Sequence, residues 1–280
     1  MFDAVSPSDS GAMQRAVEHL RVAFKRRGAD TVLDTLYQQG CLKARFPRVD
    51  PGAWPVAVTL NTSGGVAGGD RLDVALDMAA ETRMTVTAQA AERFYRVIPG
   101  TGPSVVRTRI TVGDGAAMEW LPQETILFDR CALDRVLDID LAPDSHFLGV
   151  EMLMFGRSAS GERVEAGSLR DLIRVRRDGS LLWHDAIRMD GAIDSALCRP
   201  AVANGARAIA TVLFVAPNAE GRLDDVRAAL PAGAEAGASA WNGMLLTRIL
   251  APDSASLRKV VATVLAVLRD GRALPRVWNC

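Results

Sequence analysis

The chain has 280 residues, of which 49% are hydrophobic, and its 33 basic and 33 acidic residues leave a formal net charge of +0. This length and apolar content suffice for one large domain or two small ones. The balanced charge argues against a surface devoted to nucleic acid or anionic lipid, and no apolar run reaches the ~18 residues needed to span a bilayer. Neither nucleic acid nor a membrane is therefore expected as a partner.

The N-terminal stretch and the cysteines indicate where the protein resides. The stretch MFDAVSPSDSGAMQ has neither the basic nor the apolar region of a signal peptide. The four cysteines lie far apart, with no Cys-x-x-Cys pair, which is typical of reduced thiols in the cytoplasm. We expect residues 1–15 to form a mobile tail, residues 16–280 to form a single domain, and the protein to be cytoplasmic.

Alternation of apolar and polar residues begins near residue 19 and continues through most of the chain. Leu20, Val22 and Phe24 point to one side of a segment whose other side is polar, which is the two-residue period of a β-strand. The residues Arg-Gly-Ala-Asp at 27–30 predict a turn into a second strand, 31–38. Further strands are predicted at 55–62, 71–78, 83–90, 105–112, 116–122, 135–142, 146–155, 172–189 and 206–215. So many strands at short spacing predict a mainly β fold.

Helical patterns appear only late in the chain. The clearest is SASLRKVVATVLAVLRDG at 254–271, where apolar residues recur at i, i+3 and i+4 and Asp253 or Ser254 can cap the start. The segment LDDVRAAL at 223–230 fits two helical turns, and 239–250 fits either a helix or a strand. The Ala- and Gly-rich segment 231–240 is predicted to be a loop. The fold class is thus mainly β with about two α-helices near the C-terminal part.

A dense cluster of glycines occupies the stretch NTSGGVAGGDRL at 61–72. A P-loop needs GxxxxGK[ST] followed by a helix, and a dinucleotide fingerprint needs GxGxxG opening a helix. Here no lysine follows the glycines and the next predicted element is a strand. Two readings stay open: a tight β connection in which glycine supplies positive φ, or a close approach of the backbone to another chain or a cavity.

The three histidines show no metal-ligand spacing, and no nucleophile motif accompanies them. His184 lies beside Asp185, which could orient it as a base, but a strand would place the two on opposite faces. A hydrolase that uses His184 and Asp185 is the weakest of the functional readings.

Four carboxylates occupy positions that suggest a more specific role: Asp70, Glu124, Asp129 and Glu151. A buried carboxylate costs several kcal/mol unless it is paired or bound to a metal. If the four converge, their oxygens could pass a divalent cation. Pairing with Arg71, Arg96 or Arg157 is the alternative.

Five segments in order resemble those of the urease accessory proteins called UreD (UreH in some bacteria). They are NTSGGVAGGDRL, QAAERFYRV, WLPQETILFD, FGRSASGE and LPRVWN, and the resemblance extends from about residue 20 to the end. It implies a β-rich fold with a β-helix-like winding and a pair of helices. It also implies a non-enzymatic scaffold that binds urease apoprotein and the accessory proteins UreF and UreG, of which UreG is a GTPase that carries nickel.

Members of this family are thought to contain an internal tunnel for the metal, so no tightly bound cofactor is expected, only nickel in transit. The scaffold and tunnel candidates are Asn61, Thr62, Gly64, Gly65, Gly68, Gly69, Asp70, Arg71, Gln89, Tyr95, Arg96, Gln123, Glu124, Asp129 and Glu151. Among these, Asp70, Glu124 and Asp129 are the candidates for transient metal contact. A purely structural platform without a metal route is the main alternative.

Overall fold

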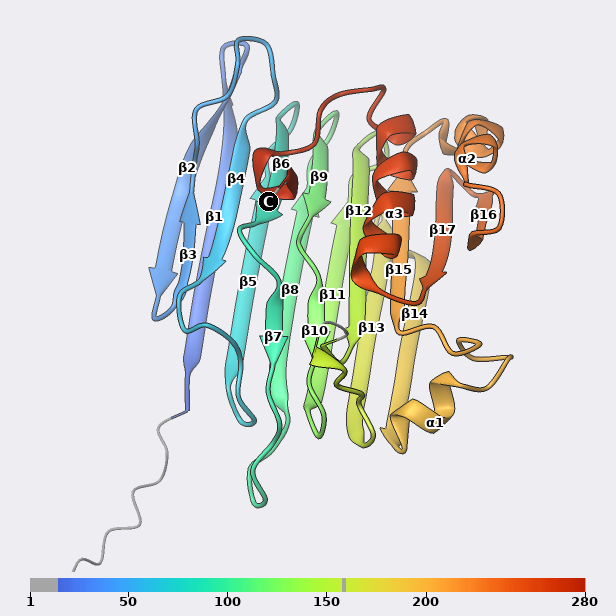
Figure 1. The fold of residues 1–280 in the computed structure, drawn as a ribbon. Helices are drawn as coiled ribbons and strands as arrows, with labels where there is room; N and C mark the ends of the chain where they lie inside the picture. The colour runs from blue at the N-terminus through green and yellow to red at the C-terminus, as the bar shows by residue number, and fades with distance from the viewer. Residues whose placement is uncertain (1–14, 158–159, 280) are drawn as a thin grey trace, which may run out of the picture.

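The computed structural model describes residues 15–157 and 160–279. Two β-sheets lie face to face, and helices cover the outer face of one of them (Figure 1). The molecule therefore has three layers, with one apolar core between the sheets and a second beneath the helices.

The first sheet has seven strands in the order β14-β13-β11-β8-β5-β1-β2. In chain order their bounds are β1 (Val17–Arg27), β2 (Asp30–Gln39), β5 (Arg71–Met78), β8 (Ser104–Val112), β11 (Ala132–Leu141), β13 (Gly167–Arg177) and β14 (Ser180–Gly191). The central pairings are parallel, whereas the edge strands β2 and β14 pair antiparallel with their neighbours.

The second sheet has ten strands, eight of them in the order β16-β17-β15-β12-β9-β6-β4-β3, with β10 and β7 joined to the side of β12. Their bounds are β3 (Leu42–Arg45), β4 (Val56–Asn61), β6 (Arg83–Ala88), β7 (Glu92–Phe94), β9 (Ala117–Leu121), β10 (Thr125–Leu127), β12 (His146–Phe155), β15 (Ala208–Val215), β16 (Glu235–Trp241) and β17 (Met244–Ala251). The helices are α1 (Ile193–Leu197), α2 (Leu223–Ala229) and α3 (Ser254–Leu268).

Between β4 and β13 the chain passes repeatedly from one sheet to the other. Strands β4, β6, β9 and β12 pair in parallel in the second sheet, while β5, β8, β11 and β13 pair in parallel in the first. The predicted mainly β class with helices near the C-terminus is confirmed. The β-helix-like winding and the single domain over 16–280 stay predictions, and the predicted tail lies almost entirely outside the described residues.

Strand β12 explains why the segment HFLGVEMLMF is apolar on both faces. Phe147, Leu153 and Phe155 belong to the core between the sheets. Val150 and Met152 belong to the second core, under α2 and α3. Because successive side chains of a strand point to opposite faces, one strand supplies both cores.

Helix α3 forms as the sequence predicts. The Asp253 side chain accepts a hydrogen bond of 2.8 Å from the Ser256 backbone N–H, which satisfies one of the unpaired donors at the helix start. Leu257, Val261 and Leu265 are fully buried against the second sheet. The i, i+4 spacing of these residues therefore fixes which side of the helix packs.

Two local predictions concern the segment that precedes α3. The ambiguous segment 239–250 is mainly strand, because β16 and β17 form an antiparallel hairpin that turns at Asn242 and Gly243. The loop predicted at 231–240 is confirmed for 231–234 and wrong beyond it, since Glu235–Trp241 is an edge strand. Pairing with β17 supplies the backbone hydrogen bonds there, so the weak strand propensity of alanine and glycine does not decide the outcome.

A buried ion pair holds the end of α3 to the second sheet. Glu119 of β9 is 1% exposed and Arg269 is 4% exposed. The Arg269 guanidinium donates two hydrogen bonds of 3.0 and 3.1 Å to the Glu119 carboxylate, and Arg272 lies 2.8 Å from the same carboxylate. Thr85 donates a further bond of 2.5 Å to Glu119. This carboxylate joins three segments far apart in sequence.

We expect Glu119→Ala to lower the free energy of unfolding by about 3–5 kcal/mol, because it leaves the Arg269 guanidinium buried without its partner. Urea denaturation followed by circular dichroism measures the change. As a control, Asp34→Ala removes the partner of Lys25 at a site where both side chains are well exposed, so little change is expected. A loss for Glu119→Ala as small as that of the control would contradict this account of the pair.

Candidate functional site

A cavity of about 220 Å³ lies between the two sheets. Most of its wall is apolar, supplied by residues such as Leu20, Leu72 and Leu137. Its polar groups gather in two places, around Asn61 and Glu92 and around Arg135 and Glu151. Gln89, a predicted tunnel residue, also lines it.

Glu92 is the carboxylate at the first polar place. The Asn61 side-chain amide donates to both of its oxygens, at 3.0 and 3.2 Å. Burial raises the pKa of Glu92 above its ordinary value, although the bond from Asn61 opposes this rise. Asn61 also accepts from the Ser63 backbone N–H at 3.0 Å, so the start of the glycine loop is fixed to the cavity wall.

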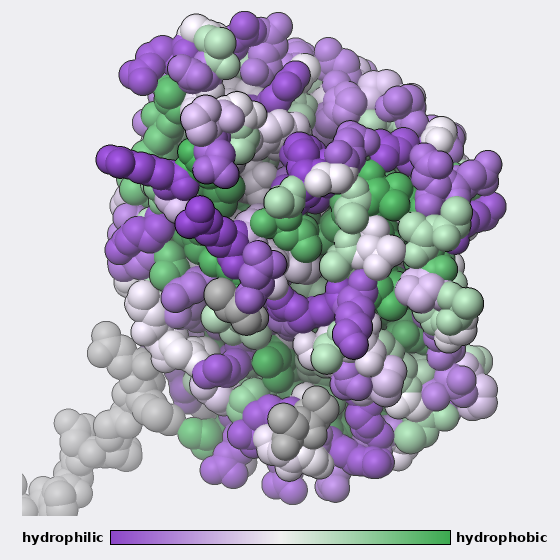
Figure 2. All heavy atoms as spheres, turned by 45° about the horizontal axis from the view of Figure 1, so that its top comes forward, coloured by the Kyte–Doolittle hydropathy of each residue, from purple (hydrophilic) through white to green (hydrophobic). Residues whose placement is uncertain are grey.

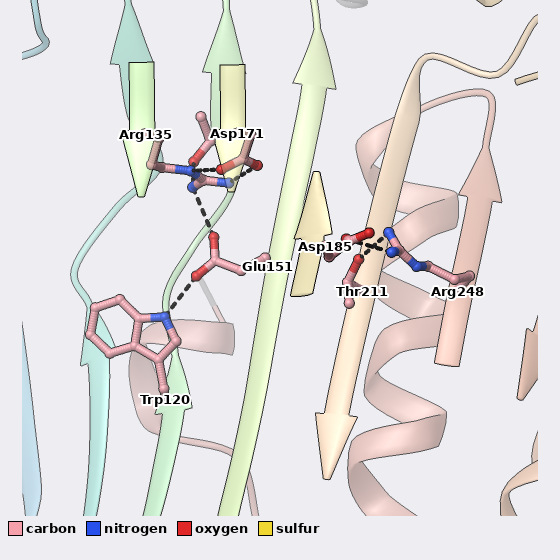
Figure 3. A network of polar contacts seen from close by, with 8 residues as sticks. Trp120, Arg135, Glu151, Asp171, Asp185, Thr211 and Arg248 are labelled. Carbon is pink, nitrogen blue, oxygen red and sulfur yellow. Dashed lines mark hydrogen bonds and ion pairs between the residues drawn. The ribbon is translucent and has the colours of Figure 1, made fainter. Parts of the chain in front are cut away.

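The second polar place is a buried cluster around Arg135. The guanidinium bonds both oxygens of Asp171 at 2.8 and 2.7 Å and lies 2.8 Å from the Glu151 carboxylate (Figure 3). Glu151 also accepts a bond of 2.7 Å from the Trp120 indole N–H, and Thr125 accepts one of 2.9 Å from Arg135. Two carboxylates face one guanidinium, and burial raises the pKa of Glu151.

A smaller cavity shares Glu151 with the first and adds Asp171, Asp185 and Thr211 to its wall. Asp185 is paired with Arg248, which donates a bond of 2.9 Å to the Thr211 hydroxyl (Figure 3). The polar groups therefore run from Asn61 to Thr211 along the space between the sheets.

His184 and Asp185 do not form a catalytic pair in this arrangement. They are successive residues of β14, with His184 exposed and Asp185 half-buried and bound to Arg248. Their different burial agrees with the prediction that the two side chains point to opposite faces of the strand.

The glycine loop at 61–72 is shaped by the side chains packed on it. A Cβ on Gly65, whose φ is +151°, would lie 2.4 Å from the Tyr95 ring, and one on Gly68 would lie 2.9 Å from Val97. Tyr95 donates a bond of 2.8 Å to the Gly64 carbonyl. Gly64 and Gly69 have φ of +80° and +85°, a region that favours glycine.

Asp70 closes this loop on itself. Its carboxylate accepts bonds from the backbone N–H groups of Ala16 at 3.0 Å and Ala67 at 2.8 Å. The N–H groups of Val66 and Gly69 bond backbone carbonyls. Several backbone donors of the loop are therefore used internally, which argues against a phosphate cradle, where backbone N–H groups converge on the anion.

The remaining predicted residues near this loop lie at its surface. Thr62 donates a bond of 3.1 Å to the Cys41 carbonyl, and Arg71 pairs with Asp73 at 2.8 Å. Arg96 is exposed, with its backbone bridged to Cys131.

Gln123 and Glu124 hold the C-terminal segment in place. Arg258 of α3 donates to Gln123 at 2.6 Å and to Glu124 at 2.9 Å. Ser254 donates to Glu124 at 3.0 Å, and Gln123 donates to the Val277 carbonyl at 3.1 Å. Both residues thus bind α3 and the chain end.

The predicted metal candidates Asp70, Glu124 and Asp129 each have a different set of partners. Asp129 accepts a bond of 3.1 Å from the Ala166 N–H and lies 3.5 Å from Arg130. Across residues 15–157 and 160–279 no cluster of three or more His, Cys, Asp or Glu is placed to hold a metal ion. Metal contact at these three positions stays a prediction.

Sequence reasoning selected Glu151 but missed Glu92, Arg135, Asp171 and Asp185. The signal for Glu151 was a charge within an apolar strand. Asp185 was considered only as a partner of His184. Each of the other three has one apolar and one charged neighbour in the sequence, so the side of the strand that it faces could not be predicted without the pairing register.

Almost the whole chain is similar to known proteins. A family model described as UreD urease accessory protein matches residues 16–279. The urease accessory protein UreD of Dinoroseobacter shibae is 45% identical over 278 residues, which cover 99% of this chain and 95% of that protein. Urease accessory protein UreD 2 of Methylorubrum populi is 46% identical over 283 residues, which cover 99% and 94%.

The chain belongs to the UreD family. The resemblance based on five segments is confirmed. In this UreD-family chain the first three segments line the cavity between the sheets. Arg157 and Glu162 of the fourth segment line another cavity beside the glycine loop. The fifth segment, LPRVWN, contacts the third through the hydrogen bond from Gln123 to the Val277 carbonyl. No helix within the described residues of this chain has the length and apolar content to cross a membrane.

We expect Glu92→Gln to raise the free energy of unfolding at neutral pH. A folded-state pKa above the ordinary 4.5 means that the stability contributed by Glu92 is present below the unfolded pKa and is lost as pH rises through the folded one. Glutamine removes this loss and keeps an oxygen for Asn61. Urea denaturation at several pH values should show an advantage that shrinks as the pH falls towards 4.5.

Glu162→Gln provides a control of opposite sign. The hydrogen bond from Arg157 holds the pKa of Glu162 below its ordinary value, so this group stabilises the fold above its unfolded pKa. Glu162→Gln should therefore be less stable at neutral pH, with a deficit that vanishes on acidification. A Glu92→Gln advantage that does not vary with pH would contradict the burial of a charged carboxylate.

Proposed function

We propose that this protein is a urease maturation scaffold that binds urease apoprotein, UreF and UreG and lets nickel pass between its two sheets. The role in urease maturation is supported by membership of the UreD family. The metal route is supported by one observation, the row of carboxylates along two cavities that share Glu151.

The chemistry of this row suits a cation in transit. Glu92, Glu151 and Asp185 offer oxygen atoms, as does the Thr211 hydroxyl, whereas among the described residues no histidine or cysteine lines either cavity. Imidazole and thiolate ligands hold a first-row divalent metal tightly, and oxygen ligands hold it less tightly. Ni²⁺ that meets oxygen ligands one or two at a time is bound weakly enough to leave each one.

The Arg135 cluster supplies the electrostatic basis of the route. Two ionised carboxylates around one guanidinium carry an excess of one negative charge. A buried excess charge is unfavourable, so either a proton on Glu151 or an arriving cation relieves it. Burial raises the pKa of Glu151, and the nearby negative charge of Asp171 adds to this rise. A cation is thus attracted to the point where the two cavities meet.

The experiment is activation of urease apoprotein with nickel, GTP and bicarbonate by a complex of this chain with UreF and UreG. We expect the double variant Glu92→Gln, Asp185→Asn to reduce urease activity and bound nickel several-fold, with the yield of the complex unchanged. Nickel content by mass spectrometry is read beside activity.

Two further variants separate the alternatives. Asp70→Asn with Glu124→Gln tests the predicted metal candidates outside the row, and Asp138→Asn, on the outer face of the first sheet, is the matched control. Full nickel loading by the interior double variant would reject the route and leave a passive platform. Absence of a complex with the unaltered chain would reject the scaffold itself.

A further inference from the structure

A third cavity, of about 790 Å³, borders the glycine loop at Ala67 and Gly68. Its charged wall consists of four arginines and two acids: Arg15, Arg96, Arg130, Arg157, Asp129 and Glu162. We call it the arginine cavity. Its charged side chains carry an excess of two positive charges, in a chain whose net charge is zero.

The two acids are already paired. Glu162 lies 2.8 Å from Arg157, and Asp129 lies 3.5 Å from Arg130 while it also accepts the Ala166 N–H. Within the described part of the chain neither Arg15 nor Arg96 has an ion-pair partner. Their guanidinium groups are therefore available to an anion from outside.

The apolar part of the cavity is held in place by contacts between its aromatic rings and their neighbours. The Tyr95 and Phe128 rings meet edge to face with centroids 5.0 Å apart, and the Arg157 guanidinium lies 4.5 Å above Phe128. Tyr95 is held by its bond to Gly64. Ile98 is 47% exposed at the rim. Arginine and aromatic side chains held in this way are typical of the centres of protein interfaces.

We propose that the arginine cavity binds an acidic segment of a protein partner, whose carboxylates pair with Arg15 and Arg96 and whose apolar side chain packs on Ile98 and Phe128. The planar guanidinium matches the two oxygens of a carboxylate. A phosphate ligand is less suited, because the adjacent loop uses its Val66, Ala67 and Gly69 N–H groups internally. The inference rests on the proposed function, which supplies the partners.

The face of the molecule shown in Figure 2 gives less support for a docking site formed by apolar surface alone. On the face shown in Figure 2, apolar side chains lie in separate areas between polar ones. The excess of positive charge therefore identifies the arginine cavity as a docking site more clearly than apolar surface area does.

The test measures the affinity of the full chain for UreF and for urease apoprotein separately, by biolayer interferometry at two salt concentrations. The variant Arg15→Glu, Arg96→Glu is compared with Arg109→Glu, Arg188→Glu, an equal charge change at two exposed arginines of the first sheet.

We expect the cavity variant to lose about tenfold or more in affinity for one partner, and we expect its remaining binding to lose the dependence on salt concentration. The control should stay within about twofold. Circular dichroism and urea denaturation verify folding, and Arg15→Lys, Arg96→Lys should retain most of the affinity.

Several outcomes would overturn the proposal. Unchanged affinity for both partners rejects the cavity as a docking site, and an equal loss in the control variant shows a general charge effect instead. Binding of inorganic phosphate that the reversal abolishes, with partner affinity intact, assigns the cavity to a small anion. If the unaltered chain binds neither partner, the proposed function fails and the docking site fails with it.

Discussion

The contact between Arg135 and two carboxylates is the interaction that the interior depends on. Arg135 and Asp171 come from β11 and β13 of the first sheet, whereas Glu151 comes from β12 of the second. The cluster therefore joins the two layers in the middle of an apolar core. A buried charge without partners costs far more than a buried apolar group. The sheets can close on these residues only in the register that brings all three together.

The same pairing register distributes charge on the outer face of the first sheet. Strand β11 carries Asp134, Asp138 and Asp140, three acidic residues on the same side of the strand. In β13 their register partners are Arg170, Arg174 and Arg176. Arg174 bonds both oxygens of Asp138 at 2.6 and 2.7 Å. These three aspartates are thus paired with arginines of the next strand and do not form a free acidic patch for a basic partner.

The two-residue period predicted the positions of most of the long strands, and the i, i+4 pattern with a capping aspartate predicted α3. The strand predicted at 172–189 is instead a hairpin of β13 and β14 that turns at Asp178 and Gly179, and the short strands β3, β7 and β10 were not predicted. The pairing partners were not predictable, because they lie in strands separated by 30 or more residues, as for Arg135 and Asp171. The edge strand at 235–241 was missed for a related reason: pairing with β17 outweighs its composition. The candidate site was predicted where a motif was local, as in the glycine loop. It was missed where carboxylates from three strands converge.

The glycine loop contributes to the walls of both the cavity between the sheets and the arginine cavity. Gly64 lines the cavity between the sheets, whereas Ala67 and Gly68 line the arginine cavity. Tyr95 donates a hydrogen bond to the Gly64 carbonyl and packs edge to face on Phe128, which lines the arginine cavity. A single side chain therefore contacts both the loop and the wall of the arginine cavity. Gly65 leaves room for the Tyr95 ring, which a Cβ at this position would meet at 2.4 Å. A protein segment bound to Arg96 would therefore lie next to the wall that holds Asn61 and Glu92. The loop places the proposed docking site beside the proposed metal route, without any phosphate-binding role for its glycines.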